Sequence, residues 1–319
     1  MLASTHASAQ DWIANTSAEE AYFSIEDLEE RGINRIPTLD KRVPYSRLNQ
    51  SAGKQRFDIR RIELERTRQL AELNRRMAAK PSLRLAQKTS ASVAANEADS
   101  LALVSLFVST KGDDWTSNAG WLTGPLATWE GVILNADGRV IDLQLATNNL
   151  VGTLPDEFFD LSELQILDLS DNLITGEIPF IVDQLASIQL LDLSFNILEG
   201  ELPTTLGNLP ELQFLILWGN FLSGPIPASL GDLTQLVELW LFSNQLTGEI
   251  PTSLGNLSDL ALLYLDDNQL TGNIPPELGQ LTNLFELFLE INQLTGGIPA
   301  ELSGLSTLDT CNRQQPTWW

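Results

Sequence analysis

An asparagine recurs every 24 residues between positions 148 and 292 of this chain, without one insertion or deletion. A glycine follows each asparagine by four residues, and a proline follows it by seven. A sequence period of this length indicates a solenoid, in which each repeat contacts only its neighbours and several repeats together bury a core. The seven asparagines are Asn148, Asn172, Asn196, Asn220, Asn244, Asn268 and Asn292.

Two columns of leucine stand three and five residues before these asparagines, as Leu265 and Leu263 do before Asn268. Residues separated by one position point to the same face of an extended chain, so each Leu-x-Leu predicts a short strand with one buried face. The asparagine side chain can both donate to and accept from the backbone of the turn that leaves the strand. The rest of each repeat, such as residues 252–260, has helical or 3₁₀ spacing and is expected on the opposite, convex side.

Residues 236–257 read LVELWLFSNQLTGEIPTSLGNL and fit the pattern LxxLxLxxNxLxGxIPxxLGxL. This pattern resembles the plant-type leucine-rich repeat of receptor-kinase ectodomains and polygalacturonase-inhibiting proteins. The resemblance covers residues 99–308 and implies an α/β solenoid: a right-handed horseshoe with a parallel sheet on its concave side and short 3₁₀ or helical segments on its convex side. It also implies paired-cysteine caps, but the one cysteine here is Cys311, and the sequence shows no kinase domain.

Composition and the repeat divide the chain into four segments. Residues 1–95 lack the repeat and are expected to be a partly disordered leader with a helix near 57–80. Residues 96–139 are expected to form an N-terminal cap, in which a helix and three tryptophans cover the open end of the first repeat. Residues 140–310 hold seven full repeats and a partial eighth, and residues 311–319 form a C-terminal tail.

Charge separates the repeats from the leader. Residues 101–319 carry three basic side chains against 28 acidic ones, whereas residues 1–100 carry 16 basic and 14 acidic ones. A surface this acidic repels the phosphate backbone of nucleic acid, which excludes nucleic-acid binding for the repeats. The same charge favours basic or neutral partners. No apolar stretch reaches about 18 residues, and the sequence therefore predicts no membrane span.

The sequence offers few parts for catalysis. The single histidine is His6, which leaves no histidine-based triad or zinc site, and no Gly-rich phosphate-binding loop is present. Asp266 and Asp267 form a carboxylate pair, but a shallow sheet offers no pocket to raise a pKa, so a solvated acidic ridge is expected. We therefore expect that the chain is not an enzyme and that it has no cofactor-binding or metal-binding site.

The side chains on either side of the buried leucines point out of the concave face, two and four residues before each asparagine. These positions are polar in the early repeats, as at Asp168 and Ser170, and aromatic in the later ones. Strands about 4.8 Å apart would bring the rings into one exposed patch edged by carboxylates, and exposed apolar patches mark interaction sites. The predicted partner-binding residues are Phe214, Trp218, Trp240, Phe242, Tyr264, Phe288, Glu238, Asp266, Glu286 and Glu290.

The expected function is noncatalytic recognition of a protein or peptide that carries basic or neutral and apolar groups, in signalling, defence or cell-surface interaction. Three alternatives stay open: self-association into a homodimer or larger assembly, docking of the leader over the patch, and glycan binding. Localisation also stays open, since a secreted or cell-surface protein is expected if the N-terminus is truncated and a cytoplasmic one otherwise.

Overall fold

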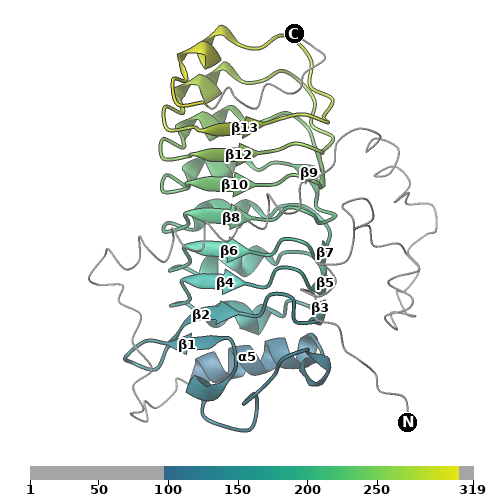
Figure 1. Ribbon diagram of the computed structural model, residues 1–319, viewed down its shortest axis with the longest axis vertical. Helices are drawn as coiled ribbons and strands as arrows, with labels where there is room; N and C mark the ends of the chain where they lie inside the picture. The colour runs from purple at the N-terminus through teal and green to yellow at the C-terminus, as the bar shows by residue number, and fades with distance from the viewer. Residues whose placement is uncertain (1–96, 309–319) are drawn as a thin grey trace, which may run out of the picture. The chain divides into compact units, whose positions relative to one another are not determined.

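The computed structural model describes residues 97–308, in which seven short strands, one per repeat, lie side by side in a parallel sheet (Figure 1). Neighbouring strands pair residues 24 positions apart, such as Leu191 with Leu215, so equivalent positions of successive repeats stack in columns. β1 (Val132–Leu134) pairs antiparallel with the first of them. The seven strands are β2 (Val140–Gln144), β4 (Ile166–Asp168), β6 (Leu190–Asp192), β8 (Phe214–Ile216), β10 (Glu238–Trp240), β12 (Leu262–Tyr264) and β13 (Glu286–Phe288).

A short 3₁₀ helix follows each strand on the convex side. A proline stands directly before each of these helices, because its fixed φ suits a helix start and its missing N–H is not needed there. The helices are η4 (Asp156–Asp160), η5 (Phe180–Gln184), η6 (Thr204–Asn208), η7 (Ala228–Asp232), η8 (Thr252–Asn256), η9 (Pro276–Gln280) and η10 (Ala300–Gly304).

A second, narrower ladder runs beside the main sheet, between each asparagine and the proline that follows it (Figure 1). Two groups of parallel strands form it, and isolated bridges such as that between Glu201 and Ser223 supplement them. Backbone pairing between repeats therefore exists on two sides of the solenoid. These strands are β3 (Val151–Thr153), β5 (Leu173–Gly176), β7 (Ile197–Leu198), β9 (Ser223–Pro225) and β11 (Gln245–Thr247).

The asparagine column is hydrogen-bonded throughout the core, as its chemistry requires. Asn196 is typical: its Nδ2 donates to Leu169 O at 3.0 Å and to Leu193 O at 3.1 Å, and its Oδ1 accepts from Ile174 N at 3.0 Å. Each such amide therefore connects two repeats and satisfies backbone groups that the leucines around it remove from water. The predicted fold class, a right-handed α/β solenoid with a parallel concave sheet, is confirmed.

The N-terminal end of the leucine core is covered by α5 (Glu97–Ser109) and by an aromatic cluster. Within this cluster, Trp121 lies 4.7 Å from Trp115 and 4.8 Å from Trp129, ring centroid to ring centroid, and Phe107 stacks on Trp121 at 5.7 Å. All four rings are buried. They give the first repeat the apolar neighbour that every later repeat receives from the one before it.

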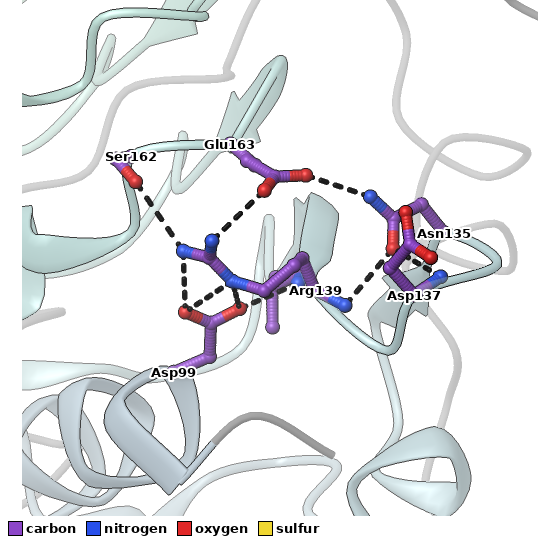
Figure 2. Close-up of polar contacts among 7 residues, drawn as sticks. Asp99, Asn135, Asp137, Arg139, Ser162 and Glu163 are labelled. Carbon is purple, nitrogen blue, oxygen red and sulfur yellow. Dashed lines mark hydrogen bonds and ion pairs between the residues drawn. The ribbon is translucent and has the colours of Figure 1, made fainter. Parts of the chain in front are cut away.

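Arg139 fastens α5 to the first repeats (Figure 2). Its Nε and Nη2 donate to Asp99, each at 3.0 Å, and its Nη1 donates to Glu163 at 2.8 Å. Asp99 also accepts from the backbone N–H of Val140 at 2.8 Å. The hydrogen bonds that Arg139 donates to Asp99, supported by the charges of Asp99 and Glu163, raise the pKa of Arg139.

The predicted cap, residues 96–139, contains α5, η2 (Gly112–Asp114), η3 (Leu126–Thr128) and β1, and its interior is aromatic. The predictions for the leader, residues 1–95 with a helix near 57–80, lie outside the described residues, as do those for the tail, residues 311–319. The last turn of the partial eighth repeat is described to Leu308.

Candidate functional site

The concave face is polar over its early strands. Ser170 donates from its hydroxyl and from its backbone N–H to Asp168 Oδ1, at 2.6 and 3.1 Å, and Ser194 repeats both contacts with Asp192 at 2.5 and 3.0 Å. The two aspartates pair in register on β4 and β6, so their carboxylates stand one strand apart. The serines hold these carboxylates in fixed orientations, and this end of the face is negatively charged.

From β8 onward the same columns carry rings, which we call the concave aromatic row: Trp218, Trp240, Phe242, Tyr264 and Phe288. Trp218 stacks on Phe242 with centroids 5.0 Å apart and ring planes 4° from parallel. Tyr264 lies 5.0 Å from Trp240 and 4.8 Å from Phe288. The rings predicted to lie together therefore do lie together, and each has an aromatic neighbour.

The exposure expected for this row is wrong for several of its members. Trp240 retains only 2% of its surface, and Phe242 and Tyr264 are also buried. Trp240 pairs with Ile216 and Tyr264 on the adjacent strands, and its ring lies 6.2 Å from that of Phe242. Its indole N–H finds no acceptor among the described residues. Within the row, Trp218 and Phe288 are the partly exposed rings.

Phe214, another predicted binding residue, is also buried. It begins β8 and pairs with Leu190 on β6 and with Glu238 on β10. No ring contact joins it to the concave aromatic row within the described part of the chain. The structure therefore places Phe214 beside the row and not within it.

Phe195 extends the aromatic cluster of the concave face, and the sequence analysis missed it. It stands one position before Asn196, where the chain leaves the strand, and its ring lies 5.6 Å from Trp218. It is 44% exposed, more than any member of the concave aromatic row. The sequence contained a signal, because Phe195 is the one aromatic residue in a column that holds Thr147, Asp171, Gly219, Ser243, Asp267 and Ile291 in the other repeats.

The carboxylates expected to edge the patch are less solvated than a ridge would be. Burial, reinforced by Glu290, raises the pKa of Asp266 to about 8, and burial also raises the pKa of Asp267 and of Glu290. The expectation that this face cannot raise a pKa is therefore wrong, because burial disfavours the charged form of these carboxyls. Glu238 is buried, and Glu286 accepts a hydrogen bond from the Tyr264 hydroxyl.

A buried carboxyl also lies at the start of the sheet. Burial raises the pKa of Asp142 to about 7, and one of its oxygens accepts from Gln144 Nε2 at 3.0 Å. Between residues 97 and 308, no three histidine, cysteine or acidic side chains are grouped so as to hold a metal ion. Over the same residues no helix is both long and apolar enough to cross a membrane.

Comparisons with known proteins agree with this architecture. A family model described as "Leucine rich repeat" matches residues 139–198, and a second with the same description matches residues 211–233, 235–257 and 259–281. A probable leucine-rich repeat receptor-like protein kinase of Arabidopsis thaliana is 36% identical over an 81-residue alignment that covers 21% of this chain and 9% of that protein. No kinase domain lies within the described residues.

Solved plant receptor ectodomains share the fold. The ectodomain of the Arabidopsis thaliana receptor kinase GASSHO1/SCHENGEN3, in complex with CASPARIAN STRIP INTEGRITY FACTOR 2, matches with a TM-score of 0.57 and 36% identity over 66% of this chain and 29% of that one. The Arabidopsis receptor kinase HAESA, in complex with the peptide hormone IDA and the co-receptor SERK1, matches with a TM-score of 0.53 and 32% identity over 67% and 41%.

The chain thus spans less than half the length of these solved relatives and under a tenth of the curated one. Such solenoids are typically non-catalytic binding scaffolds. By its repeat pattern, its fold and these likenesses, the region from residue 139 to residue 281 belongs to the leucine-rich-repeat family and is similar to the ectodomains of plant receptor kinases.

Proposed function

We propose that this chain is a non-enzymatic recognition protein that binds a protein or peptide ligand on its concave face, with Trp218 at the centre of the contact. The observation that carries the proposal is the concave aromatic row, whose rings lie outside the leucine core. A half-buried tryptophan beside an exposed phenylalanine is expensive to leave in water and is typical of binding hot spots.

The sheet that presents this row is built in advance of binding. The asparagine column and the repeated backbone pairing fix the strands, so a ligand would have little of the protein to order. The likeness to GASSHO1/SCHENGEN3 and HAESA supports the same class of function, because both were solved with a ligand bound. Signalling, defence and cell-surface interaction are the settings we propose for it.

The charge of the face limits the chemistry of the ligand. From Val140 to Leu308 the chain has no lysine, arginine or histidine and 23 acidic residues. The face therefore offers no cation for a phosphate, a sulfate or a carboxylate. We propose a ligand that is basic or neutral and carries apolar groups, because it would be attracted by the acidic residues and would cover the rings.

Selection from a displayed random peptide library tests the proposal. We expect wild-type protein to enrich peptides that bind Trp218→Ala at least tenfold more weakly, because that change removes a central aromatic anchor. Phe180→Ala is the matched control, since Phe180 is 66% exposed but lies on the convex η5. Both variants should unfold at close to the wild-type temperature. Selected peptides that bind wild type and Trp218→Ala equally well would refute the proposal.

Related measurements would reveal a second copy of the chain or a glycan on the concave face in place of a protein or peptide ligand. A homodimer in light scattering that Trp218→Ala dissociates would replace the external ligand with a second copy of this chain. Enrichment on a glycan array that is lost in Trp218→Ala, with no peptide selected, would assign the face to carbohydrate. Peptide selection from a monomeric wild type supports the proposal against both.

A further inference from the structure

We infer that Phe195, Trp218 and Asp171 form a subsite for one arginine side chain of the ligand, with the guanidinium lying over the rings and its charge directed at the carboxylate. This inference rests on the proposed function, since it names a group that the concave face recognises. It is carried by three features of the column of residues that directly precede the asparagines.

The first feature is the backbone of this column, which is left-handed at every repeat. Its φ is 54° at Asp171, 53° at Phe195 and 52° at Ser243. Aspartate, serine and glycine tolerate this conformation in a turn, but a bulky aromatic residue adopts it rarely. Phe195 is exposed and does not contribute to the leucine core, so packing does not account for a phenylalanine in this conformation. A role in binding does account for it.

The second feature is the interruption of a polar ladder. Thr147 donates to Asp171 at 3.0 Å, and Ser243 donates to Asp267 at 2.9 Å, so neighbours in this column pair by hydrogen bonds. Phe195 faces Gly219 instead. A Cβ placed on Gly219 would lie 3.2 Å from Phe195 Cδ2, so the glycine leaves room for the ring to lie over its backbone.

The result is a continuous aromatic shelf across three repeats. Phe195 lies 5.6 Å from Trp218 at 45°, and Trp218 stacks on Phe242 at 5.0 Å. Phe195 and Trp218 are the accessible part of this shelf, because Phe242 is buried. A planar group could therefore rest on the first two rings at the edge of the concave face.

The third feature is the charge beside the shelf. Asp171 is exposed and stands one repeat from Phe195, about 4.8 Å along the sheet. The repeats contain no basic side chain that could neutralise it. An arginine fits this arrangement better than a lysine, since its guanidinium is flat, stacks on aromatic faces and presents a fork of donors to a carboxylate.

Nuclear magnetic resonance on the 319-residue chain tests this subsite with a defined probe, Nα-acetyl-arginine amide. The signal is the indole N–H of Trp218, assigned by its loss in Trp218→Phe. We expect the probe to shift this signal, and the neutral isostere Nα-acetyl-citrulline amide to leave it in place. The shift per millimolar probe should fall about five- to thirty-fold in Phe195→Ser, and it should also fall in Asp171→Asn.

Serine already occupies the equivalent left-handed position in another repeat, at Ser243, so Phe195→Ser should preserve the backbone. Phe180→Ser controls for the loss of an exposed ring elsewhere on the protein. An equal shift with arginine and citrulline, or an arginine shift unchanged in Phe195→Ser, would overturn the subsite. The proposed function has a separate readout in the peptide selection. Peptides that depend on Trp218 but gain nothing from arginine would therefore contradict the subsite alone.

Discussion

Replacing Asp99 with alanine should separate the N-terminal cap from the repeats. Asp99 accepts from Arg139 Nε and Nη2, each at 3.0 Å, and from Val140 N at 2.8 Å. Its side chain is 1% exposed and that of Arg139 is 20% exposed. Alanine would leave a mostly buried guanidinium with one remaining carboxylate and a backbone N–H with no acceptor (Figure 2).

The expected loss follows from that geometry. Breaking a buried ion pair by removing one partner costs about 3–5 kcal/mol, because the other charge stays buried. The contact with Glu163, whose side chain is 42% exposed, cannot compensate, since exposed pairs contribute at most about 1 kcal/mol. We therefore expect Asp99→Ala to lower the free energy of unfolding by about 3 kcal/mol or more.

Urea unfolding followed by tryptophan fluorescence measures this effect, since Trp115, Trp121 and Trp129 lie in the cap. Glu163→Ala is the control, with an expected loss below about 1 kcal/mol. Because a solenoid repeat contacts only its neighbours, the cap signal in Asp99→Ala should change at lower urea than the far-ultraviolet circular dichroism of the repeats. Equal losses in Asp99→Ala and Glu163→Ala would refute the role we give to the buried pair.

Three further outcomes are expected. Asn220→Ala should lower the free energy of unfolding by roughly 3 kcal/mol, because it leaves Leu198 N and three carbonyls without their amide partner. The exposed Asn208→Ala is the control and should change the free energy of unfolding by less than about 0.5 kcal/mol. Asp142→Asn should stabilise the protein at pH 8 but not at pH 4. The folded pKa of Asp142, about 7, lies above the unfolded value of 3.8, so the folded state binds the carboxyl proton more tightly. The free energy of unfolding therefore falls as the pH rises from 3.8 to about 7, by at most about 4 kcal/mol. Thermal unfolding at pH 4 and pH 8 checks this. Phe195→Asn should change the free energy of unfolding by less than about 1 kcal/mol, since asparagine relieves the left-handed backbone while the ring contact with Trp218 is lost, and a larger loss in urea unfolding would show that the ring is structural.

The strands, turns and convex helices were predictable because each repeat solves the same packing problem. Each repeat needs leucines that alternate along a strand, an amide that bonds to the backbone and a proline that starts a helix, and these residues stand at fixed positions. Because the pattern occurs seven times, it determines the register of the strands. The Asn196 contacts, for example, follow from the column alone.

The candidate site was predictable only in outline. The columns placed Trp218 and Phe242 next to each other, but the burial of a ring depends on contacts outside its own column, and Trp240 is buried although its column predicts exposure. Phe195 was missed because its position faces outward only through a left-handed turn, whereas strand alternation describes the residues before it. The partnership of Asp99 with Arg139 joins residues 40 positions apart, which no repeat encodes.

Hydrogen–deuterium exchange with a peptide selected against the wild-type protein tests the central claim most directly. Recognition on the concave face predicts slower exchange in β8, in β10 and at residues 193–196 and 217–219, with no change in η6, η7 and η8 on the convex side. The same peptide should give no protection in Trp218→Ala. Protection of the convex helices alone, or binding that leaves exchange at residues 193–196 and 217–219 unchanged, would contradict the account.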